Sequence, residues 1–291
     1  MAVNLRSNPC CVTTVYSELK LATWNVNSLR VRLPHVLQWL DRTQVDLLGL
    51  QETKLIDAKF PKAEIDDAGY HVVFAGQPTY NGVAILARAE AFEPPTDVVV
   101  NNPLFPDEQV RLIAATLQPR ALTSSPTQRP AAIRFISVYV PNGAAVGTDK
   151  YDYKLRWLSA LHDYIEQELS RHGQLAMVGD YNIAPEDRDV HDPAIWHEQV
   201  LCSTPERQQF SGLLSLGLRD AFRLHDQPDQ VYSWWDYRQG AFRRNRGLRI
   251  DHVLLSAALA DRCRASGIDT EPRKLEQPSD HAPAWADCAT S

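Results

Sequence analysis

The first part of the chain alternates between two apolar patterns. Leu19–Val26 and Val45–Leu50 are short, nearly continuous apolar runs, which are typical of buried strands. Between them, apolar residues recur at helical spacing from Leu33 to Leu40, and Pro34 is acceptable in a first helical turn. The folded body is therefore predicted to open with a strand, a helix and a second strand.

Four strand-like runs follow, with little helical pattern among them. They are His71–Ala75, Val83–Ala87, Val110–Leu117 and Ile133–Val140. Successive strands without crossover helices pair in antiparallel fashion, because parallel pairing needs a long connection. The segment Gln118–Pro130 is rich in Pro, Ser, Thr and Arg, which predicts an exposed hairpin loop.

The second half of the chain repeats this order. An amphipathic helix is predicted from Leu155 to Leu169, followed by a strand over Leu175–Asp180 and another helix that stops near Gly217. Leu248–Ser256 and Ala282–Asp287 are the late strands. No linker divides the pattern, so we expect residues 1–18 to be a flexible N-terminal extension and 19–291 to be one α/β domain. Two mixed sheets would pack face to face, with helices outside.

Composition narrows the class of protein. The 291 residues are 44% hydrophobic and 23% charged, as in soluble globular proteins. Thirty basic residues against 36 acidic ones give a net charge of −6, which argues against binding to nucleic acid by overall charge but permits a local basic patch. No apolar run reaches membrane-spanning length and no signal peptide is apparent, so we expect no membrane partner. Five cysteines without a CxxC pattern favour free thiols in a reducing cytoplasm.

Polar side chains gather where the apolar strands end. Any one of them is most simply a turn former, or a buried group satisfied by backbone donors. Together they are four acidic groups, several amides, one tyrosine and one histidine, in a chain with no other dense site. These residues are Asn25, Asn27, Glu52, Tyr139, Asn142, Asp180, Asn182, Asp251, Asp280 and His281.

The residue types in this set indicate a chemistry. Oxygen ligands without thiolates select a hard cation such as magnesium or manganese. A carboxylate that is not a ligand can orient or deprotonate a water. Histidine, with a carboxylate that fixes its tautomer, can hydrogen-bond a phosphoryl oxygen, and Asn and Tyr can donate to the other oxygens. The set therefore predicts metal-assisted phosphodiester hydrolysis.

Six motifs carry a resemblance to a known family. WNVNSLR, LQETK, YVPNG, GDYNIAP, the stretch YSWWDYR with GLRIDHVLLS, and PSDHAP occur in the order and spacing of the exonuclease III family. That family belongs to the endonuclease/exonuclease/phosphatase superfamily, and the resemblance runs from Lys20 to Asp287. It implies a DNase I-like four-layer sandwich and DNA repair chemistry: cleavage 5′ to abasic sites, removal of blocked 3′ ends and 3′-5′ degradation of duplex DNA. The implied cofactor is Mg²⁺, with Mn²⁺ as a substitute.

The resemblance also implies roles for the residues around the metal. Glu52 would hold the divalent ion, with Asn25 close by and Asp280 in the metal region. Asp180 would activate or orient the attacking water. Which residue is the base, and whether one or two metal ions act, stays open.

The remaining strand-end residues would handle the phosphate. Asn182 would bind it, and His281, paired with Asp251, would contact the scissile phosphate. Tyr139 would hydrogen-bond the phosphate or the leaving group.

DNA contacts are implied for other segments. Of Trp234 and Trp235, which alternate on an extended segment, we expect Trp234 to line a pocket for an abasic sugar; the alternative is that both lie in the core. The segment from Arg238 to Arg249 carries five arginines that could bind phosphates. Further implied backbone contacts are Asn142, Arg111, Lys150, Lys154 and Arg249. The expected partner is duplex DNA with abasic sites or 3′ ends, bound by a monomer.

Other functions on the same fold stay open. Inositol polyphosphate phosphatases usually have an Arg soon after the GD-x-N motif and a late Cys-Asp-Arg motif, and this chain has neither. A secreted nuclease would need a signal peptide and usually disulfides. A non-catalytic DNA-binding protein would most simply lack Glu52, Asp180 or His281, and all three are present.

Overall fold

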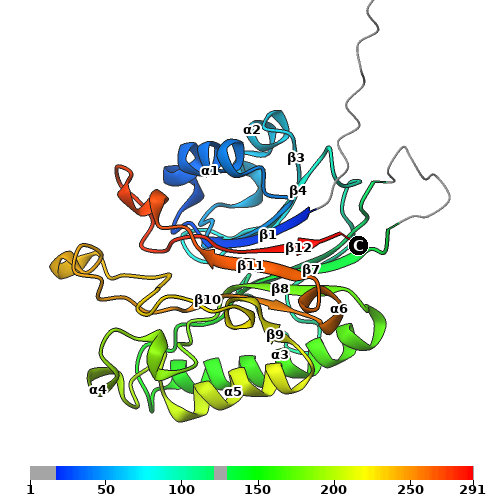
Figure 1. Ribbon diagram of the computed structural model, residues 1–291. Helices are drawn as coiled ribbons and strands as arrows, with labels where there is room; N and C mark the ends of the chain where they lie inside the picture. Colours follow the sequence, from blue (N-terminus) through cyan, green and yellow to red (C-terminus); the bar gives the residue numbers. More distant parts are fainter. Residues whose placement is uncertain (1–17, 121–129, 291) are drawn as a thin grey trace, which may run out of the picture.

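Two sheets of the computed structural model face each other, with helices on both outer sides (Figure 1). The structure describes residues 18–120 and 130–290. Four layers in the order helix, sheet, sheet, helix agree with the predicted α/β sandwich. Residues 1–17 of the predicted N-terminal extension and 121–129 of the predicted hairpin loop lie outside the described residues, and Glu18, the last residue of the predicted extension, begins the first strand.

The first sheet contains the N-terminal and C-terminal strands of the described chain. β1 and β2 pair in parallel, and every other pair in this sheet is antiparallel. In spatial order the strands are β11 (Cys263–Ile268), β12 (Ala284–Ala289), β1 (Glu18–Asn25), β2 (Leu47–Gln51), β4 (Val83–Arg88) and β3 (Tyr70–Ala75).

The second sheet has the same arrangement of one parallel pair within antiparallel neighbours. Here β7 and β8 are parallel. In spatial order the strands are β5 (Thr96–Val100), β6 (Leu112–Leu117), β7 (Ile133–Tyr139), β8 (Leu175–Asp180), β10 (Asp251–Leu255) and β9 (Arg219–Asp220).

Each sheet has its own pair of covering helices. The apolar faces of α1 (Leu29–Thr43) and α2 (Lys62–Asp67) pack on the first sheet, and those of α3 (Asp149–Arg171) and α5 (Thr204–Ser215) pack on the second. Among the described residues, no helix is long and apolar enough to cross a membrane. The short helices are η1 (Asp57–Lys59), η2 (Asp187–Asp189), α4 (Pro193–Trp196), η3 (Ala221–Leu224), η4 (Arg238–Gly240), α6 (Ala257–Ala260) and η5 (Glu271–Lys274).

The main core lies between the two sheets. Side chains such as Leu21 and Ile85 from the first sheet meet Phe135 and Val178 from the second, all fully buried. Gly49 in β2 allows the sheets to approach closely, because a Cβ there would lie 2.7 Å from Val178 Cγ2. Burial of these apolar side chains supplies most of the favourable free energy of folding. It also fixes the positions of the strand ends.

The strands differ from the prediction in two ways: one begins later, and some were not predicted. The run predicted from Leu248 to Ser256 forms a ladder only from Asp251, so Asp251 begins β10 rather than lying within it. β5 and β11 were not predicted, because β5 is a largely exposed edge strand and β11 (CRASGI) has few large apolar residues.

Candidate active site

Five elements bring polar residues to one end of the sandwich. Asn25 ends β1 and Glu52 follows β2, while Tyr139 and Asp180 end the parallel strands β7 and β8. β10 runs antiparallel to β8, so its first residue, Asp251, pairs with Asp180. Parallel strands end at the same edge of a sheet, and this topology gathers side chains that are far apart in sequence.

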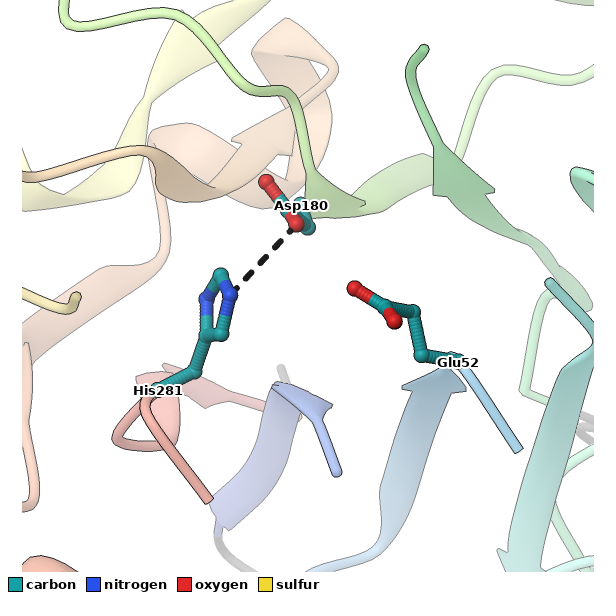
Figure 2. A group of neighbouring side chains, drawn as sticks. All are labelled: Glu52, Asp180 and His281. Carbon is teal, nitrogen blue, oxygen red and sulfur yellow. Dashed lines mark ion pairs between the residues drawn. The ribbon is translucent and has the colours of Figure 1, made fainter. Parts of the chain in front are cut away.

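Glu52, Asp180 and His281 converge on one space (Figure 2). One ligand atom from each lies within 4.8 Å of those from the others. Glu52 has a left-handed backbone with a φ of 51°, which ends β2 and turns its carboxylate toward Asp180. Within the described part of the chain, this is the group of acidic, His and Cys side chains able to hold a metal ion.

Asn25 ties the two carboxylates together. Its Nδ2 donates to Glu52 Oε1 at 2.8 Å and to Asp180 Oδ2 at 2.9 Å, while its Oδ1 accepts from the backbone N–H of Asn27. Asn25 thus lies beside the predicted metal region, but it presents N–H groups to the carboxylates rather than an oxygen to an ion. In this geometry it positions the two carboxylates, and its place at the metal stays a prediction.

His281 lies between two buried carboxylates. Its Nδ1 is 2.8 Å from Asp251 Oδ2, and its Nε2 is 3.7 Å from Asp180 Oδ2, an ion-pair distance too long for a hydrogen bond. Burial opposes charge on the imidazole, but Asp251 and Asp180 raise the pKa of His281 to about 10. His281 is therefore a cation at neutral pH.

Asp180 has a strongly perturbed acidity. Burial raises its pKa to about 7, the charge of Asp251 acts in the same direction, and the charge of His281 opposes both. A carboxylate whose pKa lies near the operating pH can accept a proton during catalysis and release it afterwards.

Two hydrogen-bond donors flank Asp180. Asn182 Nδ2 donates to the backbone oxygen of Val140 at 3.0 Å and lies 3.3 Å from Asp180 Oδ2. Burial, followed by the charges of Glu52 and Asp180, raises the pKa of Tyr139 well above its ordinary value. The phenol therefore keeps its proton and remains a donor.

Lys54 is a site residue that the sequence did not single out. Its ammonium lies 2.8 Å from Glu52 Oε2 and also donates to Asn27 Oδ1. Asn27 in turn donates to Asp280 Oδ1 at 2.9 Å. The available signal was the position of Lys54 two residues after Glu52 in LQETK.

Asp280 lies at the edge of the site and outside the three-residue group. It accepts from Asn27 and from the indole N–H of Trp234 at 3.0 Å. Burial would raise its pKa, but the charge of His281 and these hydrogen bonds hold the pKa of Asp280 below its ordinary value. The structure thus shows Asp280 bonded to Trp234 and Asn27, and its place in the metal region stays a prediction.

The two tryptophans differ as the alternation predicts. Trp235 is 1% exposed and packs with Phe242, whereas Trp234 is only partly buried and bonds to Asp280 beside His281. The interpretation that both lie in the core does not hold for Trp234. Its role in a sugar pocket stays a prediction.

Arg249 is enclosed by the protein. It is 1% exposed, and its guanidinium pairs with Asp189 and Asp220, each at 2.7 Å. The prediction of a phosphate contact is therefore wrong: a buried and doubly paired cation cannot reach a phosphate. Arg243 and Arg244, in the same run, are exposed.

The implied phosphate contact of Lys154 is also wrong. It is fully buried, pairs with Glu206 and donates to the backbone oxygens of Asn142 and Asn182. Its function is to hold two site loops, because a buried ammonium needs such partners.

Of the other three predicted DNA contacts, two touch residues of the site. Asn142 is exposed, and its Nδ2 donates to Asn182 Oδ1 at 3.1 Å. Arg111 stacks on the ring of Tyr139 at 4.9 Å, and Lys150 is exposed in the first turn of α3. Their contacts with DNA stay predictions.

Comparison with known proteins identifies the family. The model of the endonuclease/exonuclease/phosphatase family matches residues 22–281. The chain belongs to this family. Among its relatives is an exodeoxyribonuclease III from Haemophilus influenzae, 35% identical over 92% of this chain and 99% of that protein. The family resemblance carried by the six motifs is thereby confirmed.

Solved structures of the family share the fold. A 3′ phosphatase from Neisseria bound to a product DNA hairpin is 45% identical, with a TM-score of 0.84 over 92% of this chain and 98% of that one. An AP endonuclease from Archaeoglobus fulgidus is 38% identical, with a TM-score of 0.82 over the same shares of the two chains. These similarities confirm the predicted four-layer sandwich.

Proposed function

We propose that this protein is a DNA repair nuclease that hydrolyses phosphodiester bonds in duplex DNA. The observation that carries the proposal is the convergence of Glu52, Asp180 and His281 at the ends of strands from both sheets. Relatives named exodeoxyribonuclease III, 3′ phosphatase and AP endonuclease, each at least 35% identical over 92% of the chain, support the same class of reaction.

The residues present fit a hard divalent cation, which we propose to be Mg²⁺, with Mn²⁺ as a substitute. Glu52 offers carboxylate oxygens to the ion, and Asn25 holds that carboxylate beside Asp180, which stays free to take a proton. A bound ion would polarise the phosphoryl group and stabilise the charge that develops on it.

The chain's own residues supply the remaining steps. Asp180, with a pKa near neutrality, accepts a proton from the attacking water. Cationic His281, fixed by Asp251, hydrogen-bonds a phosphoryl oxygen, and Tyr139 and Asn182 donate to the oxygens as negative charge grows. His281 is already held by Asp251, whereas Asn182 must exchange its hydrogen bonds to Val140 and Asp180 for one to the phosphate.

The proposed substrates are duplexes with an abasic site, a blocked 3′ end or an ordinary 3′ end, bound by a monomer. Two Neisseria structures, named as a 3′ phosphatase and a 3′-5′ exonuclease, are 45% and 46% identical to this chain, and the archaeal AP endonuclease is 38% identical. Both 3′-end processing and abasic-site cleavage therefore belong in the proposal.

One experiment tests all three activities. Purified protein is incubated with three matched duplexes, carrying one synthetic abasic site, a 3′ phosphate or a plain recessed 3′ end, with and without Mg²⁺. We expect Mg²⁺-dependent cleavage of at least one duplex. Cleavage of inositol phosphates or sphingomyelin with all three duplexes left intact would overturn the proposal.

A further inference from the structure

Two cysteines lie opposite each other on neighbouring strands of the first sheet, away from the proposed active site. Cys263 in β11 and Cys288 in β12 are directly opposite partners in an antiparallel pair. Such partners have Cα atoms about 4.5–5.5 Å apart, within the range of about 4.4–6.8 Å that a disulfide accepts. Because the two cysteines are register partners, their side chains lie on the same face of the sheet.

A histidine approaches the more exposed member of the pair. His225 Nε2 lies 3.5 Å from Cys263 Sγ. His225 also lines a cavity of about 260 Å³, together with Arg223 and Gln227. Cys263 is partly exposed, whereas Cys288 is buried.

The surroundings give the two thiols different reactivity. The hydrogen bond from Cys288 lowers the pKa of Cys263, burial opposes this, and His225 adds to the lowering. The same contact and burial raise the pKa of Cys288. The thiolate is the reactive form of cysteine, so Cys263 is the attacking sulfur and Cys288 the resolving one.

We propose that Cys263, Cys288 and His225 form a peroxide-reactive dithiol site that closes to a disulfide between β11 and β12. The geometric basis is the direct cross-strand pairing of the two cysteines, with His225 beside the accessible sulfur.

The chemistry balances with one molecule of hydrogen peroxide. The Cys263 thiolate attacks one peroxide oxygen: an S–O bond forms, the O–O bond breaks, and the departing hydroxide takes a proton to become water. Cys288 sulfur then attacks Cys263 sulfur: the S–S bond forms, the S–O bond breaks, and the hydroxide leaves with the Cys288 proton as a second water. The two sulfurs are oxidised and the peroxide is reduced.

The test uses the full-length protein with Cys10→Ser and Cys11→Ser, so that these two thiols cannot react. After peroxide treatment we expect an intact-mass loss of about 2 Da and a tryptic fragment that joins Cys263 to Cys288. The Cys288→Ser variant should instead accumulate a sulfenic acid at Cys263 that dimedone captures. Cys202 is the internal control, because burial raises its pKa to about 12 and it should stay reduced.

His225→Gln tests the role of the histidine. We expect peroxide to oxidise Cys263 at least about threefold more slowly at pH 7 in this variant, because less thiolate is present. Nuclease activity of reduced Cys263→Ser should equal that of the parent, which also shows that this variant folds. Two free thiols at Cys263 and Cys288 after treatment, or an unchanged rate in His225→Gln, would overturn the proposal. Neither outcome depends on the nuclease substrate.

Discussion

Asp251 faces Asp180 across the β8–β10 pair, and both carboxylates point at His281. Asp251 holds the imidazole through a hydrogen bond of 2.8 Å, whereas Asp180 keeps a gap of 3.7 Å. The two acids therefore have different tasks: one orients the histidine, and the other remains available to a water. Replacement of Asp180 and titration of His281 test these two tasks separately.

Asp180→Asn should abolish cleavage while DNA binding persists. The amide keeps the shape of the side chain but cannot accept a proton, and we expect a loss of at least about 10²-fold in the single-turnover rate. Binding is measured on an abasic duplex by fluorescence anisotropy. The matched control is Asp187→Asn, since Asp187 is an exposed aspartate that follows β8 and pairs with Arg207. Retained cleavage in Asp180→Asn would remove Asp180 from the mechanism.

His281 should stay protonated well above its ordinary pKa of 6.5. Its folded-state pKa is raised to about 10, so the stability it contributes is complete below about pH 6.5 and is lost as pH rises through about 10. NMR titration of the imidazole in metal-free protein measures this, with the signal assigned from His281→Gln. Asp251→Asn should lower the pKa of His281. A wild-type imidazole that loses its proton near pH 6.5 would contradict the prediction.

Replacement of Arg249 by alanine should lower stability, whereas replacement of Arg244 should weaken DNA binding. Arg249→Ala leaves Asp189 and Asp220 buried without their cation, and we expect it to lower the free energy of unfolding by about 3–5 kcal/mol. Exposed Arg244→Ala should leave urea unfolding unchanged but weaken DNA binding, with the slope of log K against log salt reduced by about one. If Arg249→Ala unfolds like the wild type, its buried ion pairs contribute no stability.

Substitution of Trp235 should mainly lower stability, whereas substitution of Trp234 should mainly lower activity. Trp235→Ala removes a fully buried ring, which should cost about 3–5 kcal/mol. Trp234→Ala should impair abasic-site cleavage more than its loss of stability explains, and Trp234→Phe tests the indole N–H that bonds to Asp280. Equal losses of activity and stability in Trp234→Ala would instead favour a structural role for its ring.

Removal of the metal should stop the reaction and lower thermal stability. We expect EDTA to abolish cleavage and Mg²⁺ to restore it, and Mg²⁺ should raise the Tm of the wild type because an ion that binds only the folded state stabilises it. Glu52→Gln should lose most of this shift in Tm. Glu64→Gln, in α2, is a control that should keep it. An equal shift in Glu52→Gln would exclude Glu52 as a ligand.

The sequence by itself determined the strands and helices that form the layers, and the types of side chain in the site. Apolar runs such as Val45–Leu50 and Leu175–Asp180 are long enough to require burial, and the polar residues that follow them must lie at a sheet edge. The six motifs then identified the family, so Glu52, Asp180 and His281 could be named as one site before their distances were known.

Only the tertiary structure decided which of these groups meet and which are enclosed. Arg249 and Arg244 look alike in the sequence, but one lies between two buried aspartates and the other in solvent. The direct pairing of Cys263 with Cys288 likewise depends on the register of β11 against β12. Burial, strand register and side-chain direction arise from contacts between segments far apart in sequence, so local patterns do not contain them.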